Sequence, residues 1–252
     1  MKRIIFILLL VIGHVCFAQN DLVFKEANGL YNQGKYQDAI DMYESILDNG
    51  VHSSELYFNL GNANYKLNKI APSIYYYEKA LQLNPRDKEI QNNLAFAQNM
   101  TIDAIEEVPE VGLSKFMKKA MNILSFDGWA RLAIIMMIFF VGLFILYYFS
   151  YTTQRKRLAF IFSNLSLLLM LISLAFAFQK YGMVQKDRPA IVFSQETEVR
   201  SEPNLRSSEA FKLHEGTKVQ VLDTVNNWRK IKLTDGKTGW VASSDIKLLD
   251  AF

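Results

Sequence analysis

Hydrophobic and polar residues follow four different patterns along this chain. The sequence opens on a short apolar run, and residues 20–100 then carry apolar positions at helical spacing. Two longer apolar runs follow at 132–151 and 158–178, almost without charge. After Arg188 the period falls toward two, and Thr, Val and Ile become frequent, as in short strands. This order predicts a multidomain protein with an all-α part, a pair of membrane helices and an all-β part.

The first residues have the organisation of a secretory signal peptide. Lys2 and Arg3 precede an apolar stretch, and the small residue Ala18 ends a segment typical of a signal-peptide cleavage site. We predict a signal peptide over residues 1–18. The alternative is an uncleaved anchor helix, and both place the following residues outside the cytoplasm. Cleavage would remove Cys16, the single cysteine, so the remaining chain would have no disulfide, cysteine nucleophile or cysteine metal ligand.

The two longer apolar runs have the length of membrane spans. At about 1.5 Å rise per residue, each covers roughly 30 Å, the thickness of the hydrocarbon core of a bilayer. We predict transmembrane helices over 131–151 and 158–179. A buried hairpin in a soluble helical protein is the alternative, but neither run has a polar face to present to water. Ser163, Ser166, Ser173 and Asn164 in the second run are expected to face the first helix.

A basic loop, residues 152–157, joins the two spans. Its cluster of Arg155, Lys156 and Arg157 is costly to translocate, which marks the loop as cytoplasmic and makes these residues the topology determinant. The signal peptide independently places the N-terminal part outside. Both flanking parts are therefore predicted to share one extracytoplasmic compartment.

Residues 20–100 repeat themselves with a period of 34 positions. The pairs Phe24 and Phe58, Asn28 and Asn62, Tyr31 and Tyr65, and Tyr43 and Tyr77 all follow this separation. The period, together with "SSELYFNLGNANYKLNKIAPSIYYYEKALQLNP", resembles the tetratricopeptide repeat, a solenoid of paired helices. A further helix at "KEIQNNLAFAQNM" is expected to cap the stack.

The resemblance implies a concave groove that binds protein partners and is lined by the first helix of each repeat. The groove residues that it nominates are Phe24, Asn28, Tyr31, Phe58, Asn62, Tyr65 and Lys66. The alternative for each of them is packing between repeats. Asn28 and Asn59 match positions at which some family members bind a carboxylate. Phe24, Glu89 and Asn93 fill the basic positions of that clamp, so no carboxylate clamp is expected.

Residues 101–130 are predicted to be a linker followed by an amphipathic juxtamembrane helix. The stretch "TIDAIEEVPE" is acidic and is interpreted as a solvated linker. In "GLSKFMKKAMNIL" the apolar residues share one helical face, opposite Lys115, Lys118 and Lys119. Such a helix either lies in the membrane interface or packs against the repeats.

Residues 188–252 resemble a bacterial SH3 domain. The resemblance depends on the run Glu198-Val199-Arg200-Ser201-Glu202-Pro203 and on Gly239-Trp240-Val241. It implies a small barrel of five or six strands that binds cell-wall glycan or peptide, or proteins. The expected core is Val199, Val219, Val221, Ile231 and Val241. Trp228 and Trp240 are candidates for the ligand surface, with barrel packing as the alternative.

Composition and charge exclude several classes of function. The chain has 252 residues, half of them hydrophobic, and a net charge of +3. That charge is too small for a protein that neutralises many phosphates, so no nucleic acid is expected as a partner. No histidine pair has metal-ligand spacing, and neither a phosphate-binding glycine loop nor a nucleophile elbow is present in the sequence. We therefore expect a protein that is not an enzyme and that has no cofactor and no metal.

The order of the modules resembles the BatE family of the Bacteroides aerotolerance operon. This resemblance implies a bacterial inner membrane, periplasmic N- and C-terminal domains, and Bat membrane proteins with von Willebrand A-type domains as partners. Three functions stay open: a scaffold for a membrane complex, an envelope sensor or tether that binds peptidoglycan, and a regulatory subunit of a membrane enzyme or transporter. Membrane lipid is a contact in all three.

Overall fold

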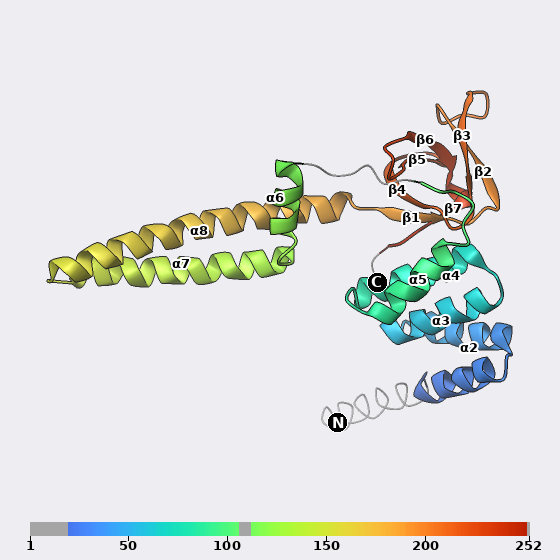
Figure 1. Ribbon diagram of the computed structural model, residues 1–252, viewed down its shortest axis with the longest axis horizontal. Coiled ribbons are helices and arrows are strands. Elements are labelled where there is room, and N and C mark those ends of the chain that lie inside the picture. The colour runs from blue at the N-terminus through green and yellow to red at the C-terminus, as the bar shows by residue number, and fades with distance from the viewer. Residues whose placement is uncertain (1–19, 106–111, 251–252) are drawn as a thin grey trace, which may run out of the picture. The chain divides into compact units, whose positions relative to one another are not determined.

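The computed structural model of this protein describes residues 20–105 and 112–250 (Figure 1). The predicted signal peptide, residues 1–18, lies outside them. The chain forms two compact units. One combines Met1–Glu107 with Arg188–Phe252, and the other is Val108–Asp187. The first unit thus contains the repeats and the strands together, and each unit is described by itself below.

The repeat region, described over residues 20–105, is helical through Gln98, as predicted for residues 20–100. Residues 20–32 form its first helix. The others are α2 (Tyr36–Asp48), α3 (Ser54–Lys66), α4 (Ile70–Leu83) and α5 (Lys88–Gln98). These make two helix pairs and a capping helix.

Local sequence sets where these helices begin and how closely they cross. Ser53 caps α3 by accepting a hydrogen bond from the backbone N–H of Leu56, and Asp87 caps α5. A Cβ at Gly61 would lie 2.6 Å from the ring of Tyr77, so only glycine lets α3 and α4 approach this closely. Ser73 Oγ also donates to the Gly61 carbonyl at 3.0 Å, which fastens α4 to α3 at the same point.

The SH3-type region, residues 188–250, is a single antiparallel sheet. Its strands are β1 (Pro189–Val192), β2 (Glu196–Arg200), β3 (Glu209–His214), β4 (Lys218–Val225), β5 (Trp228–Lys232), β6 (Thr238–Ala242) and β7 (Ile246–Leu248). Their order is β3-β2-β6-β5-β4-β1-β7. The five predicted core residues, Val199 to Val241, are all buried inside it. The short strands β1 and β7 make seven strands, more than the five or six expected.

Strand β1 contributes to two hydrophobic cores. Ala190 and Val192 are fully buried in the core of the sheet, whereas Ile191 between them is fully buried in the core of the repeats. Successive side chains of a strand point to opposite faces, so the repeat region covers the outer face of β1. Leu249 joins the same helical core. The two regions are therefore packed together and share one hydrophobic core.

Polar contacts and one glycine complete this packing. Asp103 accepts hydrogen bonds from the backbone N–H of His214 and from Thr217 Oγ1, at 2.7 and 2.6 Å. Lys218 pairs with Glu78 at 2.7 Å. Gly216, with φ of +87°, leaves so little room that a Cβ there would lie 2.8 Å from Thr101. The interpretation of residues 101–105 as solvated linker is thus wrong, because this segment contacts the SH3-type region.

The second unit contains a hairpin of two long apolar helices, α7 (Phe126–Phe149) and α8 (Thr153–Lys186), as predicted. Only 6% of the apolar window of α7 and 22% of that of α8 are buried inside the protein. A core hairpin of a soluble protein would be mostly covered, so both helices have the exterior of membrane-associated helices. Arg155, Lys156 and Arg157 are exposed in the first turns of α8. The predicted loop over 152–157 is therefore too long, because the helix already begins at Thr153 and includes the basic cluster.

The two helices contact each other through small polar residues. Ser163, Ser166 and Ser173 are buried, and Ser166 Oγ donates to the carbonyl of Met136 on α7 at 2.7 Å. The burial of the three serines agrees with the expectation that they face α7, but only Ser166 is seen to bond across, whereas Ser163 Oγ donates to the carbonyl of Phe160 on its own helix. Asn164 differs: it is exposed and donates to the carbonyl of Phe160 on its own helix.

Helix α6 (Leu113–Met121) lies across the hairpin at the end where α7 begins (Figure 1). Trp129 Nε1 donates to the carbonyl of Met121 at 2.9 Å. Lys180 Nζ on α8 donates to the carbonyls of Met121 and Leu124 and to Oδ1 of Asn122. These bonds satisfy carbonyls that the helix end leaves without a partner in its own turn.

Candidate functional site

An asparagine and tyrosine ladder lines the first helices of the repeats. Asn28 Oδ1 accepts hydrogen bonds from the Tyr43 hydroxyl at 2.5 Å and from Asn59 Nδ2 at 3.0 Å. One period later, Asn62 Oδ1 accepts from the Tyr77 hydroxyl at 2.6 Å and from Asn93 Nδ2 at 2.9 Å. The two rungs have the same geometry. We call these six residues the asparagine ladder.

The ladder fixes the orientation of its amides. Because each carboxamide oxygen of Asn28 and Asn62 is occupied twice, the amide nitrogens point away from the tyrosines. In the part of the chain that the structure describes, no hydrogen bond engages Nδ2 of Asn62 or Oδ1 of Asn93. The second rung therefore offers one donor and one acceptor.

The tyrosine hydroxyls of the ladder are held in their neutral form. Burial raises the pKa of Tyr43 to about 12, and burial likewise raises the pKa of Tyr77 well above its ordinary value. Both groups therefore stay protonated and act as donors to the asparagines at physiological pH. The ladder is uncharged, which suits an uncharged polar ligand surface.

A cavity of about 330 Å³ opens at the second rung. Four predicted groove residues line it: Tyr31, Asn62, Tyr65 and Lys66. Tyr77, Glu89, Asn93 and Phe96 complete the lining. Charge is confined to Lys66 and Glu89, both exposed. The site therefore combines aromatic walls, free amide groups and one charge of each sign.

The other predicted groove residues have different places. Phe58 lines a neighbouring cavity of about 360 Å³ with Asn59 and Glu89. Phe24 and Asn28 line neither of these two cavities. The ring of Phe24 lies 5.7 Å from that of Tyr43, and the ring of Phe58 lies 5.9 Å from that of Tyr77. The phenylalanines thus also pack between the helices of a repeat.

Sequence reasoning did not nominate Asn59, Asn93 and Phe96 as groove residues. The signal for the first two was present, because Asn59 and Asn93 are themselves one period of 34 positions apart. Phe96 has no such partner in the first repeat. It is 61% exposed on α5.

The two predicted tryptophans of the SH3-type region share a face of the sheet. Trp228 on β5 pairs with Ala242, and Trp240 on β6 pairs with Lys230. Residues two apart on a strand lie on one face, so Trp228, Lys230 and Trp240 are on the same side. Both indoles are half-buried. They form a short aromatic strip beside a cation.

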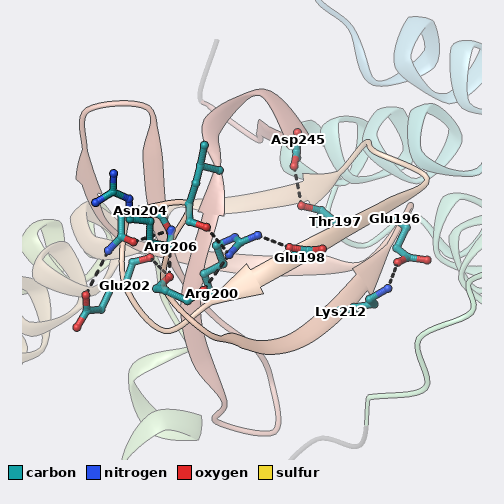
Figure 2. A network of polar contacts seen from close by, with 11 residues as sticks. Glu196, Thr197, Glu198, Arg200, Glu202, Asn204, Arg206, Lys212 and Asp245 are labelled. Carbon is teal, nitrogen blue, oxygen red and sulfur yellow. Dashed lines mark hydrogen bonds and ion pairs between the residues drawn. The ribbon is translucent and has the colours of Figure 1, made fainter.

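The loop between β2 and β3 is ordered by Arg200 (Figure 2). Its Nη1 donates to the carbonyls of Leu205 and Ser207, at 3.0 and 2.8 Å, and its Nη2 pairs with Glu198. Asn204 and Glu202 add hydrogen bonds within the loop. Arg200 lies opposite Trp240 in the strand pairing of β2 with β6. Its guanidinium is nevertheless occupied by the loop, so its role is to position the loop.

The described residues offer little to a metal ion. Within 20–105 and 112–250, no three histidine, cysteine, aspartate or glutamate residues come close enough together to hold one.

Two family models match parts of the chain. The tetratricopeptide repeat matches residues 54–87, and the bacterial SH3 domain matches residues 196–247. No curated protein matches the chain. Among solved structures, an NlpC/P60 family protein from Bacillus cereus ATCC 10987 is 13% identical over 28% of this chain and 23% of that chain, with a TM-score of 0.22. The protein is thus a tetratricopeptide repeat and bacterial SH3 domain protein with two long apolar helices.

Proposed function

We propose that this protein is a non-enzymatic scaffold of the bacterial inner membrane. Helices α7 and α8 anchor it, and both the repeat region and the SH3-type region lie in the periplasm. The repeat groove holds a segment of a protein partner. The complex that it assembles is linked to aerotolerance or to envelope stress. The observation that carries the proposal is the free donor and acceptor of the asparagine ladder inside an aromatic groove.

The ladder fits an extended peptide. A peptide main chain presents one donor and one acceptor per residue, and an unpaired one costs free energy once it is desolvated. Asn62 Nδ2 and Asn93 Oδ1 match such a pair. Tyr31, Tyr65 and Phe96 add apolar surface for the side chains of the peptide, and aromatic residues commonly dominate protein interfaces.

The cluster of basic residues between the apolar helices supports the proposed compartment. Arg155, Lys156 and Arg157 favour the cytoplasm by the positive-inside rule, which leaves both binding regions in the periplasm. The resemblance to the BatE family suggests the partners, namely Bat membrane proteins with von Willebrand A-type domains.

Site-specific photocrosslinking in cells tests the scaffold. A photoreactive amino acid at Tyr65 or Lys66 should capture a protein partner. The same group at Asp38, exposed on α2 and outside both cavities, should not. Asn93→Leu, which removes the free acceptor, should weaken the crosslink at Lys66. Equal capture from Asp38, or none from either groove position, would overturn the assignment of the groove.

A second candidate is a tether that binds peptidoglycan. It is favoured by the aromatic strip of Trp228 and Trp240 together with the bacterial SH3 match. The test is co-sedimentation of the full chain, in detergent, with purified peptidoglycan. The isolated SH3-type region is unsuitable because it would expose Ile191 and Leu249. Retention that Trp228→Ala and Trp240→Ala abolish, and that Leu222→Ala on the exposed side of β4 preserves, would support the tether.

A further inference from the structure

Asn164 is an exposed polar side chain near the middle of an apolar helix. It lies on α8 in the apolar run 158–178, four positions from the midpoint at Leu168, which corresponds to about 6 Å along the helix. For a run that spans a hydrocarbon core of about 30 Å, the nearer edge is then about 9 Å away. A short amide side chain does not reach that far, so in a membrane Asn164 faces lipid unless another protein covers it.

The hydrogen-bonding capacity of this amide is only partly used. Nδ2 donates to the carbonyl of Phe160 on the same helix at 2.8 Å, and in the part of the chain that the structure describes the side chain makes no other hydrogen bond. A second N–H and the acceptor Oδ1 remain. Lipid tails cannot satisfy them, and an unpaired polar group in hydrocarbon costs free energy. The amide therefore indicates a partner that approaches α8 from the lipid side.

The residues around Asn164 form a seam that suits a second helix. Four exposed residues follow it at alternating intervals of four and three positions: Leu168, Leu171, Ala175 and Phe178. At 100° per residue they all lie within about 40° of Asn164 around the helix. The buried Ser166 and Ser173 lie about 160–180° away, on the side covered by α7 (Figure 1). We call these five exposed residues the Asn164 seam, and their spacing is that of helices paired as a coiled coil.

A second copy of this chain is the partner that fits the amide. All copies insert into the membrane in one orientation, so two Asn164 residues lie at the same depth without any adjustment. In a parallel pair related by a two-fold axis, the unused N–H of each amide meets Oδ1 of the other. This reciprocal pairing satisfies both side chains. A helix of another protein would need a matching polar group at the same depth.

We propose that α8 forms a parallel homodimer through the Asn164 seam, with the two Asn164 amides hydrogen-bonded to each other. The proposal rests on the membrane anchoring of the proposed function but not on the repeat groove. Each dimer carries two repeat grooves, so a scaffold built on it holds two partner segments.

Disulfide crosslinking in native membranes tests the seam. In a Cys16→Ser background, Leu168→Cys should form a disulfide-linked dimer on oxidation with copper phenanthroline. Leu169→Cys is the matched control, because it is also exposed and at nearly the same depth but lies 100° further around the helix. It should crosslink far less. Equal crosslinking at the two positions, no dimer of Leu168→Cys, or a disulfide from Leu168→Cys to a different protein would overturn the proposal.

The role of the amide is tested by energy transfer between full chains labelled at Gln154→Cys and diluted in lipid vesicles. Asn164→Leu should raise the dissociation constant of the dimer by about three- to tenfold, the range expected for interhelical hydrogen bonds in membranes. Asn164→Gln keeps the amide and should associate as the labelled parent chain does. An unchanged dissociation constant in Asn164→Leu would overturn the proposed hydrogen bond.

Extraction of the membranes with alkaline carbonate separates failure of the dimer from failure of the anchoring. The chain should stay in the membrane fraction. Retention without a Leu168→Cys dimer would overturn the dimer and leave the anchoring intact, whereas release would contradict both. A Leu168→Cys dimer without any groove crosslink from Tyr65 would overturn the assignment of the groove and support the dimer.

Discussion

Nδ1 of His214 lies 2.7 Å from Oδ1 of Asp103, and the backbone N–H of the same histidine donates to the other carboxylate oxygen at 2.7 Å. One aspartate of the repeat region thus holds the end of β3 at two points. Thr217 adds a third bond at 2.6 Å. The carboxylate is the polar centre of the packing between the two regions.

Asp103→Asn should weaken this packing. Burial raises the pKa of Asp103, but the hydrogen bonds from Thr217 and His214 outweigh burial, and its pKa lies below the ordinary value. The charged form is therefore favoured by folding. We expect a loss of about 1–2 kcal/mol in the free energy of unfolding at pH 7, reduced by partial exposure of the site. Denaturant titration of the full chain in detergent measures it.

The pH dependence has a definite sign. A carboxyl group with a lowered folded-state pKa stabilises above its unfolded pKa, and the contribution disappears as pH falls through the folded value. The difference between the Asp103→Asn variant and the unmodified chain should thus be constant near neutrality and shrink below roughly pH 4. Glu209→Gln, an exposed change on β3, is the control. A difference that persists unchanged in acid would contradict the assignment.

Gly216→Ala should separate the two regions. A Cβ would lie 2.8, 2.9 and 3.0 Å from atoms of Thr101, Ile74 and Ile70, and the φ of +87° adds strain. Gly236→Ala has a similar φ of +93° in open space, so it reports strain alone, about 1–2 kcal/mol. The clash should cost Gly216→Ala about 1–3 kcal/mol more. Limited proteolysis after residue 100 would show whether the regions part, and equal effects of both changes would refute the clash.

Gly61→Ala should destabilise the repeats. The added methyl group would lie 2.6 Å from the ring of Tyr77, which also carries the hydrogen bond to Asn62. We expect a loss of about 1–3 kcal/mol and weaker crosslinking from the groove. Gly29→Ala is the matched control, because it has open space in a helix and should stabilise by up to about 1 kcal/mol. Thermal melts followed by circular dichroism compare the two variants.

Lys180→Met should loosen α6. The change removes the donor that holds the carbonyls of Met121 and Leu124 while keeping a long apolar side chain. Amide hydrogen exchange in α6 should accelerate by about tenfold, which corresponds to loss of one or two hydrogen bonds. Arg131→Met, exposed on α7, should leave exchange unchanged. Unaltered protection in Lys180→Met would show that α6 is held by other contacts.

The topology prediction can be checked by cysteine labelling. In a Cys16→Ser background, Gln154→Cys should resist a membrane-impermeant reagent in cells with a permeabilised outer membrane. Glu209→Cys, exposed on β3, should react under the same conditions. Labelling at position 154 would place Arg155, Lys156 and Arg157 in the periplasm and reverse the proposed orientation.

The modules could be predicted from the sequence because each has its own period. The 34-residue repeat, the charge-free runs and the alternation of Val219 and Val221 are each visible in a short stretch of sequence. Each pattern reflects packing inside one module. The sequence predicted part of the asparagine ladder for the same reason, because Asn28 and Asn62 are one repeat period apart.

The packing between the regions was missed because no single period encodes it. One clue existed: the run "AIVF" from Ala190 to Phe193 has no polar position, which is typical of strands buried on both faces. Asp103 gave no signal at all. An aspartate in an acidic stretch has the composition of a solvated linker, and only the fold brings it to His214, 111 positions away.

The sharing of β1 between two cores has a consequence for the order of synthesis. The repeats leave the ribosome first, but Ile191 and Leu249 belong to their hydrophobic core and are made later. Lys79 likewise donates to the carbonyl of Asp250, 171 positions downstream. The repeats therefore keep an unfilled apolar face until β1 and the residues after β7 have been made and have folded onto them. A chain interrupted before that point would display this face to chaperones and proteases. The C-terminal strands thus cover an apolar surface that shortened chains would leave exposed.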